Sequence, residues 1–490
     1  MGVSDYVTNI VTLFKNVTLN ALGVERDLYQ LLEDKDISRA ISLMQDNDKD
    51  VDNALKEYYP QQHEVMKRPN KPRKNMPPYI TCKLPRAIQR YINEVELSFL
   101  FGNPIKWEKE DGDYEAFELF MDFIKSSRFN SNMRAVKRIA GSETESAKLY
   151  HIYRDEENNV YIKPVVLARS TGYKLRPLFD QYGDLVAFAY GYVVKSSNGK
   201  NVEHWDIHTP QVIFECSKDA LIGWKVSPRE NPTGKINIIY YKQKKAWDGV
   251  EPRIARIEDT DSKIGDTNNL FAEPIAFATA DVVEMMKDPE ASGKMIKATK
   301  DGKFEYINPP AASELREAEK KDLMDSVLFD TFTPNLSVEA LSSMSGELSG
   351  VAIKRLMSLA YLKRANLMEI YEEMLDREKS VIISALKVKH PEMANKLDAL
   401  KIRFSISEPF EEDKHTEWKS LTSLYGAGLV SLEKAVEMLA LTKSPQEEID
   451  RIKMAQMEKL MAEQELKTEQ AQEATQTEET EEETEETEEI

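Results

Sequence analysis

The sequence predicts a multidomain α+β chain that is mainly helical and contains one antiparallel β region. Three observations support this prediction. At 490 residues the chain is too long for one ordinary core, so two to four domains are expected. Apolar residues recur at helical spacing over most of the length. Between Lys148 and Tyr241 the period changes to two, which indicates strands.

Composition and charge narrow the class of protein. The two cysteines, Cys82 and Cys216, are too few for a disulfide framework, so a reducing interior is expected. The first ten residues lack the apolar core of a signal peptide, and no run of about 18 apolar residues predicts a membrane helix. Net charge is −19, and 13 Glu against one Lys in residues 463–490 supply −12 of it. A chain with this net negative charge is not expected to bind nucleic acid through its overall charge.

The N-terminal part, residues 1–80, reads as short helices followed by a linker. The helices are too short to form a core and should dock on a larger body. Gln61 to Pro78 holds four prolines and five Lys or Arg residues. It is either a basic arm touching DNA or an acidic neighbour, or a solvated connector. The connector is favoured, because proline-rich loops usually only connect.

Residues 81–252 combine helices with the β region. A helix from Leu84 to Phe101 ends at Gly102-Asn103-Pro104, and two further helical stripes follow. Beyond Lys148, turn signals such as Asn198-Gly199 separate five or six predicted antiparallel strands.

A polar helix is predicted from Arg253 to Phe271, with a thin apolar stripe. Most of the surface of this helix should be exposed to solvent, or the helix should pack against copies of itself. Its acidic cluster is either a metal-dependent nuclease site or a solvated face, and the solvated face is favoured. The cluster comprises Glu258, Asp259, Asp261 and Asp266.

A small α/β insert follows at residues 275–310. Lys300-Asp301-Gly302-Lys303 predicts a hairpin between 295–299 and 304–307. Its lysines could meet phosphate or merely keep the hairpin soluble, and both readings stay open.

A second helix pair spans Ala311 to Leu386. Phe332-Thr333-Pro334 ends the first helix, and Asn335 to Gly350 holds five serines and two glycines. This composition favours a moving or tightly turning loop. A long helix follows, up to His390-Pro391. A strand at 400–406, three helices between 411 and 466, and a disordered acidic tail at 463–490 complete the chain.

No catalytic constellation is present in the sequence. There is no Walker A loop, no His-Glu-x-x-His and no Gly-x-Ser-x-Gly, and neither cysteine has a partner at zinc spacing. We therefore expect no enzyme, no catalytic residue, no cofactor and no bound metal.

The order of these parts resembles the portal proteins of tailed double-stranded DNA bacteriophages, in particular those of long-tailed phages of Gram-positive hosts. The resemblance covers roughly residues 80–460 and rests on order and spacing rather than on one motif. The segments that carry it are Leu97 to Ile105, Thr333 to Ser337, Ser349 to Lys354, and Gly426 to Ser431 leading to Glu447 to Ile452.

The resemblance implies a portal fold assembled as a ring, usually of twelve subunits, at one capsid vertex. It assigns a wing (81–252, with the long helix and strand of 351–407), a stem (253–274 and 311–334), a clip (275–310), a tunnel loop (335–350) and a crown (408–462). Double-stranded DNA would pass through the channel during packaging and ejection. The terminase large subunit and a head-completion adaptor would dock on the clip, and major capsid and scaffolding proteins would surround the wing. Assembly would occur in the host cytoplasm, without a membrane, and the product would be part of the virion.

The resemblance also implies three sets of site residues. The tunnel loop would present Ser342, Ser343, Met344, Ser345, Gly346, Glu347, Ser349 and Gly350 to the channel. The clip would present Lys287, Lys294, Lys297, Lys300 and Lys303. The stem would line the channel with Glu258, Asp261, Lys263, Glu317 and Lys320. Two alternatives remain: a metal-dependent DNA-processing enzyme, and a capsid-associated adaptor or scaffold protein without a channel.

Overall fold

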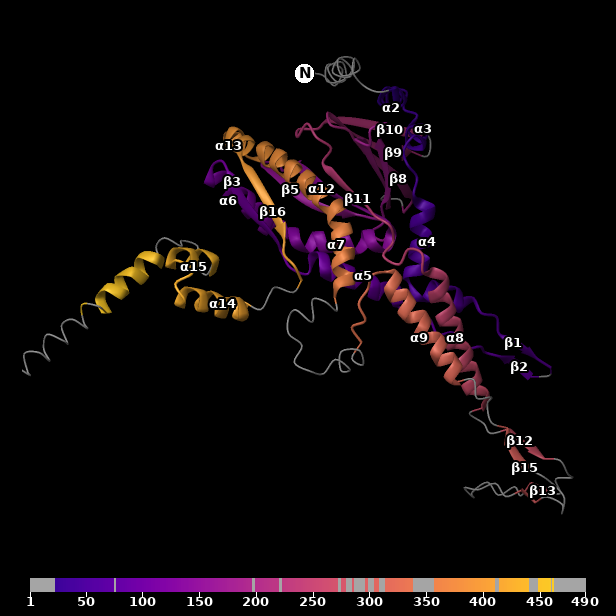
Figure 1. Ribbon diagram of the computed structural model, residues 1–490. Coiled ribbons are helices and arrows are strands. Elements are labelled where there is room, and N and C mark those ends of the chain that lie inside the picture. The colour runs from indigo at the N-terminus through magenta and orange to yellow at the C-terminus, as the bar shows by residue number, and fades with distance from the viewer. Residues whose placement is uncertain are drawn as a thin grey trace, which may run out of the picture. The chain divides into compact units, whose positions relative to one another are not determined.

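The computed structural model divides into two compact units, Met1–Pro409 and Phe410–Ile490, which are described separately (Figure 1). The structure describes residues 23–74, 76–195, 199–219, 223–271, 275–278, 284–285, 296–297, 304–307, 313–337, 357–409, 414–439, 448–459 and 461.

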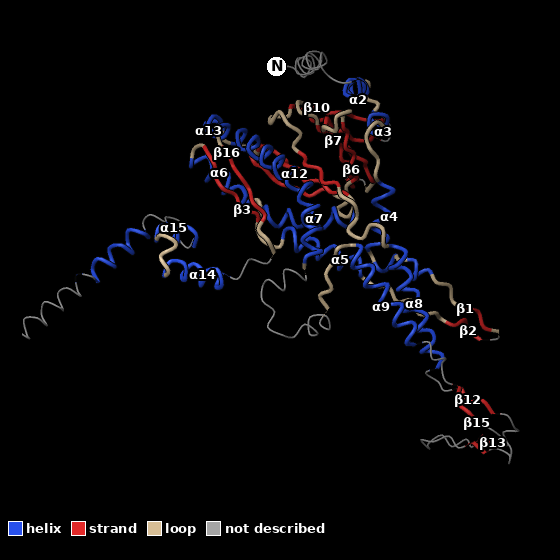
Figure 2. The backbone as a smooth tube through the Cα atoms, viewed as in Figure 1, coloured by secondary structure: helices blue, strands red, loops and turns tan. Residues whose placement is uncertain are grey.

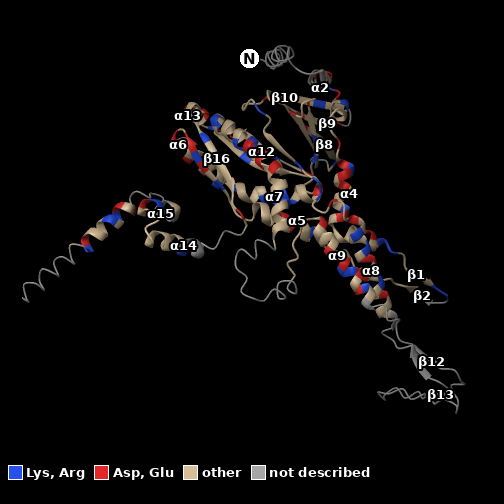
Figure 3. Cartoon of the chain, in the orientation of Figure 1, with Lys and Arg blue, Asp and Glu red and all other residues tan. Residues whose placement is uncertain are grey.

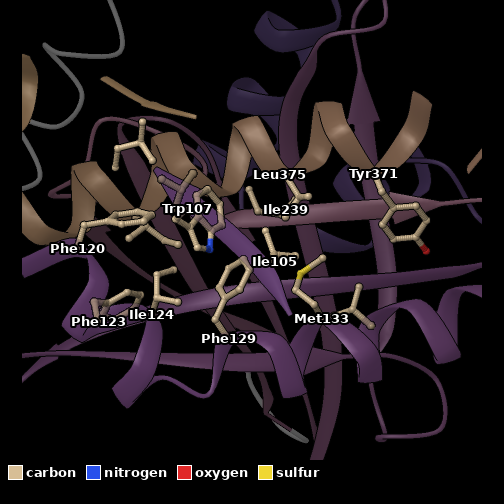
Figure 4. Packing of buried hydrophobic residues seen from close by; sticks show 14 of the residues in the cluster. Ile105, Trp107, Phe120, Phe123, Ile124, Phe129, Met133, Ile239, Tyr371 and Leu375 are labelled. Atoms are coloured by element: carbon tan, nitrogen blue, oxygen red, sulfur yellow. The ribbon is translucent and has the colours of Figure 1, made fainter. Parts of the chain in front are cut away.

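The main core of the first unit lies where helices meet a two-stranded sheet. Trp107 stands at its centre, with edge-to-face contacts to Phe120, Phe129 and Phe404 at ring-centroid distances of 5.3 to 5.6 Å (Figure 4). The elements around it are α5 (Ile88–Phe101), β3 (Ile105–Asp111), α6 (Tyr114–Ser126), α7 (Phe129–Glu143), α12 (Ser358–Lys389), α13 (Ala394–Ala399) and β16 (Lys401–Ile406), the last paired with β3. Two strands of a second sheet also contribute: β4 (Glu145–Arg154) through Tyr150, and β11 (Ile238–Lys242) through Ile239 and Tyr241.

Eight strands between residues 145 and 242 form two antiparallel sheets (Figure 2). The sequence predicted one region of five or six strands. Period-two patterning shows that strands exist but not which strands pair. The first sheet has the order β11-β4-β5, with β4 (Glu145–Arg154), β5 (Val160–Leu167) and β11 (Ile238–Lys242). The second has the order β10-β9-β8-β7-β6, with β6 (Lys174–Phe179), β7 (Leu185–Lys195), β8 (Asn201–His208), β9 (Val212–Asp219) and β10 (Gly223–Glu230).

The predicted docking of the N-terminal helices is confirmed for α2 (Gly23–Glu33) and α3 (Ile37–Ser42). Leu28 and Leu32 are buried in one cluster with Trp205 and Phe214 of the five-stranded sheet. α4 (Asp48–Tyr58) instead buries Tyr58 in one cluster with Ile254 and Ile257, where it stacks on Trp247. Residues 1–22 lie outside the described range.

The polar helix is α8 (Glu251–Phe271), and α9 (Ser313–Asp330) packs against it. Between them in sequence, β12 (Ile275–Ala278) pairs with β15 (Phe304–Ile307), and β13 (Glu284–Met285) pairs with β14 (Ile296–Lys297). The predicted hairpin joining 295–299 to 304–307 is therefore wrong. A local turn signal favours a hairpin, but a two-stranded ribbon is marginal alone, so longer-range pairing can displace it.

The second unit contains α14 (Lys414–Gly426), α15 (Leu432–Leu439) and a helix over 448–459. Lys453 pairs with Glu433 at 3.0 Å and links the last helix to α15. Across the described part of the chain, no helix combines the length and the apolar character that membrane crossing requires.

Candidate functional site

The α8–α9 pair is held by an apolar seam flanked by ion pairs. Ile254 and Ile257 of α8 are buried in one cluster with Val327 of α9. The Arg256 guanidinium lies 2.8 Å from Glu319, and Arg253 pairs with Asp330. Apolar contact and charge therefore act together to join the two helices.

A second face of α8 binds the segment that follows α4. Glu258 is 2 % exposed, although the sequence favoured a solvated position. Its Oε1 lies 2.7 Å from Nδ1 of His63 and accepts the backbone N–H of Arg86 at 2.8 Å. His63 precedes the short turn η2 (Glu64–Lys67), so Glu258 fixes both ends of the stretch from 63 to 86.

Asp266, two turns further along α8, holds the middle of this segment. Its carboxylate accepts the backbone N–H of Cys82 at 2.7 Å, the Arg68 guanidinium at 3.1 Å and the Tyr79 hydroxyl at 3.2 Å. Burial alone would raise the pKa of Asp266, but the Cys82 N–H and the Arg68 charge outweigh it and hold that pKa below its usual value. Between the two acids, Gly265 leaves room for Cys82, whose Sγ would lie 3.0 Å from an added Cβ.

We call residues 63–86 the strap, since they lie along α8 and are bound by its carboxylates. Asp261 completes the binding surface: Arg86 of the strap pairs with one of its oxygens, and Lys320 of α9 lies 3.2 Å from the other. Ser262 Oγ accepts the Leu84 N–H at 3.0 Å. The prediction of a solvated acidic face is wrong for Glu258, Asp261 and Asp266, because protein donors occupy these carboxylates. Asp259, the fourth member of the cluster, is partly exposed and lies 2.7 Å from Lys263.

The same contacts test whether two of the residues predicted to line the channel can do so. Glu258 and Asp261 have side chains only 3 % and 10 % exposed, and they face the strap and α9. Their placement on a channel surface is therefore wrong. Lys320 is half-buried against Asp261, whereas Lys263 and Glu317 are exposed, so a lining role stays a prediction for these three.

The proline-rich linker is not a simple connector. Arg68 is bound by Asp266 of the same chain, whereas a simple connector would leave it in solvent. The linker also forms a hairpin, β1 (Lys71–Arg73) with β2 (Met76–Tyr79). A usable signal was present in the sequence: Glu258, Ser262, Gly265 and Asp266 share one helical stripe that is polar but interrupted by glycine.

Sequence reasoning missed a buried ion pair that anchors α12. Lys148 of β4 and Glu378 of α12 have side chains with no exposed surface and lie 2.8 Å apart. The Tyr150 and Tyr241 hydroxyls also donate to Glu378. Burial lowers the pKa of Lys148 despite the opposing charge of Glu378. A charged residue within the apolar stripe of Leu375 and Ile382 was the available signal.

A second buried charge group lies nearer the start of α12. Lys137 of α7 pairs with Glu96 of α5 at 3.0 Å, and Lys363 of α12 lies 3.9 Å from the same carboxylate. Eight residues after Lys363 in α12, the Tyr371 hydroxyl donates a hydrogen bond to Gln243 at 2.7 Å. Both groups stabilise the attachment of α12 to the rest of the unit, and they fix the position of α12 along its axis because each buried charge must meet its partner.

Most other predicted site residues lie outside the described range. This holds for all the tunnel-loop residues from Ser342 to Gly350 and for Lys287, Lys294, Lys300 and Lys303. Lys297 belongs to β14, and only its backbone is described. In the part of the chain that is described, no group of three His, Cys, Asp or Glu residues could hold a metal ion.

A family comparison identifies the chain. The family described as "Phage portal protein, SPP1 Gp6-like" matches residues 44–460, which include the strap, the helix pair and the core around α12. The chain belongs to the phage portal protein family. The portal protein matches no curated protein.

Solved structures similar to this portal protein come from gene transfer agent (GTA) particles. "Neck of native GTA particle computed with C12 symmetry" contains a chain with 10 % identity and a TM-score of 0.40, covering 72 % of this chain and 89 % of that one. "Neck of empty GTA particle computed with C6 symmetry" gives 9 % identity and a TM-score of 0.43, with coverages of 80 % and 94 %. "Virion of native gene transfer agent (GTA) particle" gives 10 % identity, a TM-score of 0.40, and coverages of 72 % and 89 %.

Proposed function

We propose that this portal protein assembles into a closed ring, of twelve subunits, at one capsid vertex of a virion. Double-stranded DNA passes through the ring during packaging and ejection. The observation that carries this proposal is the family match over residues 44–460, which spans the α8–α9 pair together with the body that it adjoins. The role is structural and involves no catalysis by this chain.

The arrangement of the stem supports a conduit. α8 leads directly to β12, and β15 leads back to α9 after a few residues, so the small module lies at one end of the helix pair. This module, the clip, is the surface we assign to the terminase large subunit and later to the head-completion adaptor. The body around α12, the wing, is the surface for scaffolding and major capsid proteins. Assembly takes place in the host cytoplasm.

In this proposal the tunnel loop is residues 335–350, and its part from 341 to 350 faces the DNA. Replacing Gly346 and Gly350 by bulky residues should reduce the number of filled heads in a packaging assay and leave ring formation unchanged. Loss of rings in the same variant would make the segment an assembly element instead.

The ring itself is tested by native mass spectrometry and negative-stain images of the purified full-length protein. Closed rings with a central hole are the expected result, and a monomer at micromolar concentration contradicts it. The rings should also bind duplex DNA weakly, since the chain carries a net charge of −19 and a conduit must release its strand. A strong affinity that falls steeply with salt would contradict the conduit.

The nuclease alternative has lost its supporting feature. It required carboxylates free to bind metal, but Glu258, Asp261 and Asp266 are each bound by protein donors. A nuclease assay of the purified protein with magnesium or manganese tests this alternative. Cleavage that Asp261→Ala abolishes would establish the alternative and overturn the proposal of a non-catalytic chain.

A further inference from the structure

The hairpin β1–β2 is a basic, exposed projection at the middle of the strap. Lys71, Arg73 and Lys74 are exposed, and residues 71–79 contain no acid. The Arg73 guanidinium lies 5.0 Å from the centroid of the Tyr79 ring, a cation–π contact that holds the charge near the hairpin rather than letting it fold away. Within the described residues, none of these three cations forms an ion pair. The hairpin therefore presents unpaired positive charge.

An exposed stripe of opposite charge runs along α9. Leu315, Ala318, Asp322, Asp325 and Phe329 follow one another at spacings of three and four, which places them on one helix face. All five are exposed, and Leu315 and Phe329 are exposed by 74 % and 64 %. The two aspartates form no ion pair within the described residues. The stripe therefore combines two exposed carboxylates with an exposed apolar side chain near each end.

These two surfaces lie on different sides of the stem. The face of α9 that contacts α8 carries Val327 and Met324, so the stripe points away from α8. The hairpin belongs to the strap, which α8 binds through Glu258 and Asp266. Figure 3 shows Lys and Arg on the hairpin on one side of α8, and α9 on the other. One chain therefore cannot satisfy its own stripe with its own hairpin.

A closed ring joins two different faces of each subunit, in contrast to a two-fold dimer, which joins one face to itself. The hairpin and the α9 stripe are two such faces with complementary charge. We propose that the β1–β2 hairpin of one subunit docks on the α9 stripe of the adjacent copy, with its cations on Asp322 and Asp325. This inference rests on the proposed ring and names the contact that closes it.

The occupant is a second copy rather than DNA for two reasons. The aspartates of α9 repel the phosphates of DNA, whereas the cationic hairpin complements them. Leu315 and Phe329 need an apolar partner, which the proline-rich hairpin and the exposed Ile80 next to it provide. DNA contact by the hairpin would leave the entire α9 stripe unexplained.

A charge-reversal series on the full-length protein tests the contact. K71E/R73E/K74E and, separately, D322K/D325K should each weaken one interface roughly tenfold, which is the effect of losing two or three partly exposed ion pairs. Native mass spectrometry across a salt series gives the fraction of rings. Combining both sets of reversals should restore rings, because the charges are then exchanged rather than opposed. K195E/K200E/K225E, which reverses three exposed cations at the five-stranded sheet, is the control for net charge.

The outcomes separate this inference from the proposed function. If the wild-type protein forms no rings, the proposed function fails. If wild-type rings form and both reversals leave their salt stability unchanged, the ring stands and the hairpin contact is overturned. If K71E/R73E/K74E lowers duplex binding but leaves ring stability unchanged, the hairpin is a DNA contact and this proposal is wrong. Failure of the combined variant to recover rings would equally overturn the pairing.

Discussion

Glu378 is the buried acceptor on which the attachment of α12 depends, and Glu378→Gln removes its charge while keeping its shape. In the native protein this carboxylate lies 2.8 Å from Lys148 and accepts two tyrosine hydroxyls. The two hydroxyls donate to different oxygens of Glu378, so glutamine keeps an acceptor for only one of them and leaves the ammonium without a counter-charge. Breaking a buried pair in this way costs about 3–5 kcal/mol.

The proton of Lys148 limits this cost. A lysine with an ordinary pKa near 10.4 can release its proton at pH 7 for about 4.6 kcal/mol, since each pH unit is worth about 1.36 kcal/mol. The unfolded variant then binds one proton more than the folded variant, so its stability rises with pH. We expect the penalty of Glu378→Gln, relative to wild type, to shrink as pH rises from 7 toward 10, by up to about 1.4 kcal/mol for each pH unit once Lys148 is neutral in the folded variant.

Hydrogen exchange of β4 and α12 peptides measures this local stability without requiring two-state unfolding of a long chain. The matched control is K148M/E378Q, which removes the unpaired cation and should recover most of the loss. A penalty below about 1 kcal/mol, or a double variant no more stable than Glu378→Gln, would refute the argument that this pair anchors α12.

Three further predictions concern other parts of the molecule. Asp266→Asn should destabilise the attachment of the strap to α8 by about 1.5–3 kcal/mol at pH 7, measured as faster proteolysis within residues 68–82. Because the pKa of Asp266 lies below its ordinary 3.8, the difference in stability from wild type should persist as pH falls to 4 and disappear only below that. Burial lowers the pKa of His208 to about 3 from 6.5, so the unfolded chain binds the extra proton as pH falls. His208 should therefore contribute a loss of about 1.4 kcal/mol per pH unit between 6 and 4, and His208→Leu should remove that contribution from the difference between its acid unfolding curve and that of wild type. Gly191→Ala should cost about 1–3 kcal/mol in thermal unfolding, because its Cβ would lie 2.6 Å from the Trp205 ring. Gly426→Ala, with nothing within 4 Å of the added Cβ, should leave the thermal unfolding unchanged.

Elements with strong local patterning were predictable. The thin apolar stripe of α8 predicted that helix within two residues of its start, and the alternation beyond Lys148 predicted strands. Pairing was not predictable, because the strand period is shared by all partners: β15 pairs with β12 rather than with the nearer 295–299.

The acidic cluster shows the same limit at the level of the site. Glu258 and Asp266 recur at helical spacing, which is equally compatible with a solvated face, a metal site and a docking surface. The contacts with His63 and Arg68, almost 200 residues earlier in the chain, show that the cluster is a docking surface. Burial of a carboxylate is decided by donors that approach from elsewhere, and no local pattern records them.

The sequence by itself determined the order of the parts and the absence of catalytic motifs, and through them the portal family. Those properties depend on residue types and short spacings, which local physics controls. The tertiary structure alone decided that the basic linker is a strap on α8, that Lys148 and Glu378 meet inside the body, and that a basic hairpin and an acidic α9 stripe remain unpaired within one subunit. Each of these is a match between charges distant in sequence, and its free energy exists only once folding brings them within a few ångströms or leaves them in solvent.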